Sequence, residues 1–126
     1  MKKVLEPGIL HQEQKEVTHE DTAAKYGSGM VEVFATPAMI AFMENTALKT
    51  VLPYLAENQN TVGFELNIRH LKPTPVGKKV QCKAILKEID GKKLVFDLEA
   101  WDDAGIIGKG THTRYIIDTE KFMKQF

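Results

Sequence analysis

The sequence predicts an α+β domain in which a curved antiparallel β-sheet wraps around one long central α-helix. Two observations lead to this fold class. Residues 36–55 are apolar with helical periodicity, and several stretches after them alternate between apolar and polar residues and are separated by tight turns. A sheet with one apolar face needs a cover, which this helix supplies. The 126 residues suffice for one sizeable core, so residues 1–126 are expected to form a single domain.

Short elements are expected before the central helix. Residues 9–17 are polar and extended, which suits an edge strand or a loosely held arm. Residues 18–21 have the pattern that begins a helix, and Gly27 is expected to end that short helix. Residues 30–34 predict a short strand that leads into the central helix.

Thr36 and Pro37 mark the beginning of the central helix. A threonine side chain can cap free N–H groups, and proline already has the φ angle of a first helical residue. One stripe of the helix is apolar except for a single carboxylate, Glu44, and glutamate is almost never fully buried unless it is paired. The stripe consists of Pro37, Ile40, Ala41, Glu44, Ala47, Leu48 and Val51.

Four antiparallel strands are expected after a loop at residues 56–60. The first strand alternates strictly, with Val62, Phe64, Leu66, Ile68 and His70 toward the core and Gly63, Glu65, Asn67 and Arg69 away from it. Asp90-Gly91 predicts a tight hairpin, residues 102–105 a further turn, and residues 106–118 a last long strand before a short helix at 119–123. Because open sheet edges favour pairing, edge-to-edge dimerisation is expected.

Composition excludes several function classes. The 17 Lys and Arg residues balance the 17 Asp and Glu residues, which argues against nucleic acid or an anionic membrane as a partner. No apolar run is long enough for a membrane span or a signal peptide, so a cytoplasmic location fits. Cys82 is the only cysteine, which excludes an internal disulfide and a cysteine-based metal site. No metal, phosphate-loop or dinucleotide motif is present, so neither a cofactor nor a metal is expected.

Three polar residues in unusual positions form the candidate site. Glu44 lies on the apolar stripe, His70 ends a core-facing strand, and Thr36 lies at a helix N-terminus, where N–H groups point outward. A carboxylate in apolar surroundings has a raised pKa unless a cation or hydrogen-bond donors compensate, and a nearby imidazole could do so. This set suits hydrolysis, with Glu44 as nucleophile or general base, His70 as proton carrier, and the N–H groups near Thr36 as an oxyanion site.

Simpler structural interpretations stay open for the same residues. Thr36 could be only a helix cap, and His70 could face solvent where its strand ends. Glu44 could form a structural ion pair with Arg69 or Arg114, or face a subunit interface.

His112 and Arg114 share a strand face with Gly108 and Gly110. These glycines indicate either a bulge or a close approach of the backbone to a ligand or a partner strand.

The same residues carry a resemblance to a known family. Segments 33–47, 61–63, 68–70, 73–77, 90–91 and 107–114 look like the hotdog-fold thioesterases of the fluoroacetyl-CoA thioesterase-like group. The resemblance extends from about residue 15 to Phe122, and its most specific part is Ala-Thr-Pro-Ala-Met at 35–39 followed by Glu44. It implies dimers whose sheets join edge to edge, and hydrolysis of acyl-CoA thioesters without a metal.

The resemblance also assigns residues. The family's catalytic threonine, glutamate and histidine fall on Thr36, Glu44 and His70, and the glycine and arginine that line its acyl pocket fall on Gly63 and Arg114. It therefore implies an acyl-CoA thioesterase for a short-chain acyl-CoA, with its site at the interface of a homodimer or of a tetramer of two dimers.

The resemblance does not extend to fluoroacetyl specificity, because the family's aromatic gate falls on Met30 and a neighbouring aromatic position on Gly27. The basic residues available for the CoA moiety are Arg69, Lys72, Lys78 and Lys79. The alternative function is a non-catalytic acyl-CoA-binding or sensing protein with the same pocket. A hydratase ranks last, because its Asp and His pattern in a Gly-flanked loop is missing.

Overall fold

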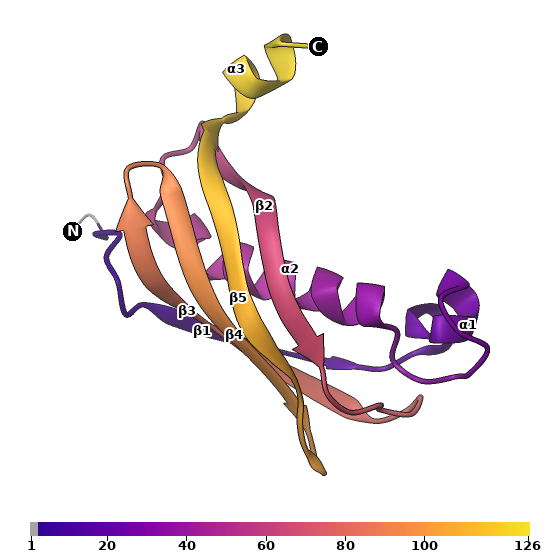
Figure 1. The fold of residues 1–126 in the computed structure, drawn as a ribbon. Helices are drawn as coiled ribbons and strands as arrows, with labels where there is room; N and C mark the ends of the chain where they lie inside the picture. The colour runs from indigo at the N-terminus through magenta and orange to yellow at the C-terminus, as the bar shows by residue number, and fades with distance from the viewer. Residues whose placement is uncertain (1–2) are drawn as a thin grey trace.

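The computed structural model describes residues 3–126 and contains one curved five-stranded antiparallel sheet with helix α2 across its concave face (Figure 1). The predicted sheet around a central helix is therefore confirmed. The strand order is β1-β3-β4-β5-β2, which leaves β1 and β2 at the two edges. The strands are β1 Leu10–Glu16, β2 Gln59–His70, β3 Lys79–Asp90, β4 Lys93–Asp102 and β5 Gly105–Asp118, and the helices are α1 Ala23–Tyr26, α2 Thr36–Val51 and α3 Thr119–Lys124.

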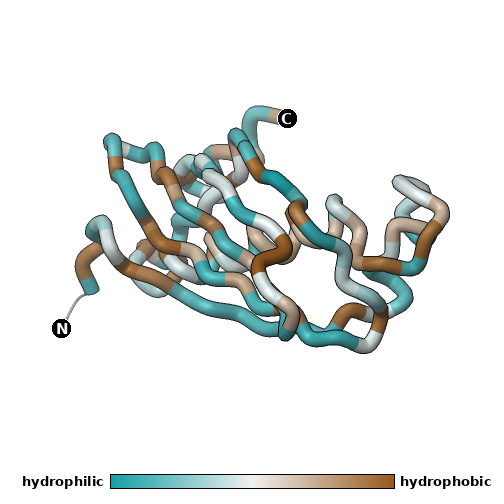
Figure 2. Tube along the Cα trace, turned by 60° about the horizontal axis from the view of Figure 1, so that its bottom comes forward, coloured by the Kyte–Doolittle hydropathy of each residue, from teal (hydrophilic) through white to brown (hydrophobic). Residues whose placement is uncertain are grey.

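Alternation along the strands creates one buried sheet face. Every second residue of β4 is buried, which includes Leu94, Phe96, Leu98 and Ala100, as the sequence predicts. Figure 2 shows hydrophobic and hydrophilic residues following one another along the strands. None of the helices between residues 3 and 126 is long and apolar enough to cross a bilayer.

The expected strand at residues 30–34 does not form. Val33 makes only an isolated bridge to Pro75, and Phe34 makes one to Thr22. The prediction was wrong because the backbone of this segment has no neighbouring strand with which to form a continuous ladder of hydrogen bonds. The segment instead delivers the chain to the beginning of α2.

Two predicted details of α2 also differ. The helix begins at Thr36, and its N-cap is Ala35, so the interpretation of Thr36 as the capping residue is wrong. The helix ends at Val51 and continues as a 3-10 turn, η2, at Leu52–Tyr54, so the predicted end at residue 55 was too late. Pro53 explains the change, since its ring has no N–H donor and would clash with the preceding helical turn.

The buried face of α2 is rotated relative to the predicted stripe. Of that stripe only Ala47 and Val51 are fully buried, whereas Pro37 and Ala41 are exposed and Glu44 is half-buried. The helix is apolar on nearly all sides, so its periodicity does not select one face. The buried residues of α2 are Ala38, Met39, Phe42, Met43, Thr46, Ala47, Thr50 and Val51.

A β-bulge in β2 determines which of its residues face the helix. The register of β2 against β5 shifts between Gly63 and Glu65, so Phe64 is an extra residue. Gly63 is paired with Arg114 and faces the helix, whereas Phe64 contacts Tyr115 at a ring distance of 5.1 Å on the outer face.

The strict alternation predicted for this strand is therefore wrong on one side of the bulge. Val62 and Phe64 face outward and Gly63 faces inward, the reverse of the prediction. Beyond the bulge, Leu66 and His70 share the inner face with their partners in β5, as predicted.

Candidate active site

Thr36 and His70 form one half of the candidate site. Thr36 is the first residue of α2, and His70 ends β2, opposite Gly108 of β5. The hydroxyl oxygen of Thr36 lies 2.8 Å from Nδ1 of His70, within hydrogen-bonding distance. The hydroxyl that the sequence assigned to capping thus contacts the imidazole instead. A hydroxyl and an imidazole at this distance can exchange or share a proton.

The His70 imidazole has one nitrogen free for chemistry. Its Nε2 is buried and has no hydrogen-bond partner among the described residues. Burial lowers the pKa of His70 below its ordinary value, and the backbone of Lys72 acts in the opposite direction. The ring is therefore neutral at neutral pH, so a nitrogen can accept a proton.

A cleft of about 470 Å³ opens beside this pair. It is lined by residues 33–36 and 70–73 together with Ala23 and Ser28. Lys72 borders the cleft, and its ammonium lies 3.6 Å from a carboxylate oxygen of Asp102. The cleft thus combines an apolar wall, a hydroxyl, an imidazole and a cation.

Glu44 and Arg114 form the other half. Oε2 of Glu44 lies 3.7 Å from Nη1 of Arg114, and the Glu44 side chain is 37% exposed. The arginine is buried and donates from Nε to the Thr61 hydroxyl at 2.7 Å and from Nη2 to the Thr61 carbonyl at 3.0 Å. The expected partner cation of Glu44 is therefore Arg114, and full burial of Glu44 is not observed in this chain.

Gly63 creates the space in which this pair meets. A Cβ atom at Gly63 would lie 2.6 Å from Oε2 of Glu44 and 3.6 Å from Nη1 of Arg114. The absence of a side chain at this position of β2 lets the carboxylate approach the sheet. Glu44 thus meets Gly63 and Arg114, the two residues that the family resemblance assigned to the acyl pocket.

The two halves are separated within one chain. Glu44 follows Thr36 by eight residues along α2. With a rise of about 1.5 Å per residue, they lie roughly 12 Å apart along the helix axis. The structure brings together Thr36 with His70 and Glu44 with Arg114 and Gly63, but it does not bring the two groups into contact.

Sequence reasoning missed Thr61, and it placed His112 on the strand face of Arg114 without assigning it a role in holding that arginine. Thr61 accepts two of its hydrogen bonds, and Nε2 of His112 lies 3.2 Å from its Nη1. The strand parity that His112 shares with Arg114 was its signal in the sequence, and Thr61 has no comparable signal. Among residues 3–126, no group of three His, Cys, Asp or Glu side chains could hold a metal ion.

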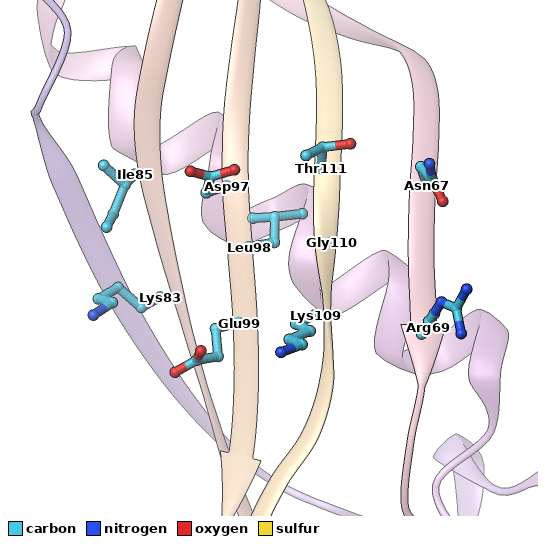
Figure 3. A pocket seen from close by; sticks show the side chains of 10 residues that line it. All are labelled: Asn67, Arg69, Lys83, Ile85, Asp97, Leu98, Glu99, Lys109, Gly110 and Thr111. Carbon is cyan, nitrogen blue, oxygen red and sulfur yellow. The ribbon is translucent and has the colours of Figure 1, made fainter.

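Another hollow, of about 570 Å³, lies elsewhere. It lies on the outer face of the sheet and is lined by charged side chains of both signs, including Arg69, Lys83 and Glu99 (Figure 3). It contains none of the predicted catalytic residues. Arg69 lines this hollow on the outer face, and the cation beside Glu44 is Arg114 instead.

The two glycines of β5 are close-approach positions. A Cβ at Gly108 would lie 2.7 Å from Sδ of Met39 in α2, and one at Gly110 would lie 1.9 Å from the carbonyl oxygen of Asn67 in β2. A bulge also adjoins Gly108, because the register of β4 against β5 shifts between Ala100 and Trp101 and leaves Ile107 as an extra residue. The two glycines bring the helix and the edge strand close to β5, beside the candidate site.

Comparisons with known proteins identify relatives of the chain. A family model described as fluoroacetyl-CoA-specific thioesterase matches residues 17–120. The fluoroacetyl-CoA thioesterase of Streptantibioticus cattleyicolor is 36% identical over 91 residues, which cover 72% of this chain and 66% of that protein. The match thus spans just under two thirds of that relative's length.

Solved structures extend the similarity to nearly the whole chain. A structure of the fluoroacetyl-CoA thioesterase FlK has a TM-score of 0.91 at 29% identity and covers 98% of this chain and 96% of that one. A thioesterase superfamily member from Thermus thermophilus has a TM-score of 0.88 at 29% identity and covers 100% of this chain and 93% of that one. The predicted hotdog fold is therefore confirmed.

Proposed function

The chain belongs to the fluoroacetyl-CoA-specific thioesterase family, a family of thioester hydrolases, and from this premise we propose that it hydrolyses a short-chain acyl-CoA to the free acid and CoA. The observation that carries the proposal is the contact of Glu44 with Arg114 across the gap at Gly63. This contact holds the Glu44 carboxylate beside the buried Arg114 guanidinium, at the position where Gly63 has no side chain.

Glu44 is the general base in this proposal. Its carboxylate takes a proton from a water molecule while the water oxygen attacks the thioester carbonyl carbon. The C–S bond then breaks, and the proton passes through His70 to the leaving sulfur, so that acid and thiol are the products. The free N–H groups at the N-terminus of α2, near Thr36, stabilise the developing oxyanion.

We propose that two copies of the chain build each site. The roughly 12 Å between Thr36 and Glu44 along one helix prevents both from acting on the same carbonyl within one chain. The middle of β2, residues 63–67, is exposed at a free sheet edge, and Phe64 is 69% exposed. Exposed apolar edges of this kind pair with a second strand.

The antiparallel geometry of such pairing supports a shared site. In a dimer, the β2 strands of the two copies would pair antiparallel about a two-fold axis near Leu66 and Asn67. Gly63 of one copy would then lie opposite His70 of the other, to within about one residue. The Thr36 and His70 pair of one copy then meets the Glu44 and Arg114 pair of the other. Two such dimers could associate further into a tetramer.

The proposed acyl group is short, and fluoroacetyl specificity is not part of the proposal. Gly63 and Arg114 line the acyl pocket, and the close packing around Gly63 leaves space for few carbon atoms. Met30, at the family's gate position, is 97% exposed and covers no part of the cleft in this chain.

Thiol release across a panel of acyl-CoAs of increasing length tests the proposal. We expect turnover of acetyl- and propionyl-CoA that falls with chain length. Glu44→Gln should lower kcat by roughly 100- to 10,000-fold, the usual contribution of a general base, with the thermal midpoint unchanged. Glu57→Gln, an exposed loop change, is the matched control. Undiminished turnover by Glu44→Gln would refute the assigned base, and binding without turnover in wild type would favour the binding-protein alternative.

A further inference from the structure

His112 is a buried histidine. One of its ring nitrogens faces a group that can only accept a hydrogen bond, and the other faces a group that can only donate one. The His112 side chain is 1% exposed. Nδ1 lies 2.8 Å from the backbone carbonyl oxygen of Glu65, and Nε2 lies 3.2 Å from Nη1 of Arg114. A carbonyl oxygen only accepts hydrogen bonds, and a guanidinium only donates them. His112 is therefore the neutral tautomer with its proton on Nδ1 and a free electron pair on Nε2.

We propose that His112 is a positioning residue for the thioesterase site, in which Nε2 accepts a hydrogen bond from Arg114 and thereby directs the guanidinium toward Glu44. This inference rests on the proposed function, because it assigns a purpose to the contact between Glu44 and Arg114. His112 itself does not touch the reacting atoms.

The contacts of Arg114 show what His112 adds. Two of the three guanidinium nitrogens donate to Thr61, and the third, Nη1, donates to His112. Nη1 is also the atom that lies 3.7 Å from Oε2 of Glu44. Of its two N–H groups, one is therefore engaged by the imidazole, and the other is available on the side of the carboxylate.

His112 also borders the space next to the carboxylate. A Cβ atom at Gly63 would lie 3.4 Å from Cε1 of His112, in addition to its approach to Glu44 and Arg114. Three side chains thus converge on the position where β2 lacks one. The centroid of the Phe96 ring of β4 lies 6.2 Å from that of the imidazole.

The charged groups around the imidazole favour its neutral form. Burial and the charge of Arg114 lower the pKa of His112, and the bond to the Glu65 carbonyl and the charge of Glu44 oppose them, with a net lowering. A protonated ring would lose its acceptor and face the guanidinium with a like charge. The neutral tautomer is thus the form that can hold Arg114.

Two substitutions separate the positioning role from a merely structural one. His112→Gln places an amide oxygen near the Nε2 position, so it keeps an acceptor for Arg114. His112→Asn places an amide N–H near the Nδ1 position, so it keeps the bond to the Glu65 carbonyl and loses the acceptor. The matched controls are His11→Gln and His11→Asn, at the opposite edge of the sheet, in β1.

The positioning role predicts that His112→Asn lowers kcat roughly 10- to 100-fold with little change in KM, the effect expected for one hydrogen bond to a charged group. His112→Gln should retain most of kcat. In an Arg114→Lys background, His112→Asn should lower kcat little further, because lysine has no guanidinium for residue 112 to position. A structural role predicts instead that kcat follows the thermal midpoint, with His112→Asn the better tolerated variant.

Two results would overturn the inference. One is equal kcat for His112→Asn and His112→Gln, with Glu44→Gln inactive, which would leave the proposed function intact. The other is nitrogen NMR of the wild-type imidazole with the proton on Nε2, a measurement that needs no folded variant. An active Glu44→Gln would instead contradict the proposed function itself.

Discussion

A Cβ atom added to Gly63 would lie 2.6 Å from Oε2 of Glu44, so the carboxylate occupies the space that a side chain in β2 would need. The contact joins an edge strand to the middle of the central helix. It follows from the bulge at Phe64, which turns Gly63 toward the helix. The inner face of the sheet thereby receives a carboxylate where strict alternation would have placed valine and phenylalanine.

Gly63→Ala should impair activity more than stability. The carboxylate is the flexible end of a side chain that is 37% exposed, so it can move away from the added methyl group at little cost to the fold. It then loses its place beside Arg114. We expect kcat to fall by roughly 10-fold or more, as for a displaced catalytic group, while the thermal midpoint changes little. A variant with wild-type kcat would contradict the assigned position of Glu44 in the site.

Mixing two inactive variants tests whether two copies share each site. A mixed dimer of Glu44→Gln and His70→Ala has one site that carries both changes and one that is intact. If half of the dimers in an equal mixture are mixed, activity should return to about a quarter of wild type. The chains must be unfolded and refolded together so that subunits exchange. No recovery, with mixed dimers demonstrated by mass spectrometry, would mean that Glu44 and His70 of the same chain act together.

Stability should decrease as pH falls through about 6.5, because burial lowers the pKa of both His70 and His112 below that ordinary value. In this range the unfolded chain binds more protons than the folded chain, so protonation favours unfolding. Denaturant unfolding between pH 8 and pH 5 measures the effect, with pH values chosen to bracket the ordinary histidine pKa. His70→Gln should reduce the slope of the unfolding free energy against pH.

A separate loss of stability is expected at lower pH. The pKa of Asp102 is lowered despite its burial, by hydrogen bonds from the Ala104 N–H and the Thr74 hydroxyl and by Lys72. A carboxyl group with a lowered pKa stabilises the fold above its ordinary value of 3.8 and loses this effect below it. Asp102→Asn should therefore leave the slope near pH 6.5 unchanged. If it removed that slope, the assignment to the histidines would be wrong.

Cys82 should be inert in the folded protein. Burial raises the pKa of its thiol to about 11, and a hydrogen bond with Thr46 only partly opposes this. The thiolate that reacts with thiol reagents is therefore scarce at neutral pH. A thiol reagent should detect no protein thiol in the native state and one per chain after denaturation, which keeps the thiol-release background low. Rapid labelling of the native protein would show that β3 opens from α2.

Most of the order of elements and the candidate residues Thr36, Glu44 and His70 follow from the sequence because they depend on local patterns, whereas Gly63 and Arg114 were assigned by the family resemblance. The Asp90-Gly91 pair predicts the hairpin, whose two turn residues are Gly91, with a φ of 62°, and Lys92, and β4 alternates without interruption. Glu44 was recognisable because a carboxylate on an apolar helix stripe needs a partner.

The partners of these residues were decided only by the tertiary structure. The Thr36 hydroxyl lies within hydrogen-bonding distance of His70 and caps no N–H group. The cation beside Glu44 is Arg114 rather than Arg69. Both outcomes depend on the register of β2 against β5, which one extra residue at Phe64 changes. Periodicity describes how side chains are distributed around a single element. It contains no information about which residue of a distant strand lies opposite, because closure of the whole sheet determines that register.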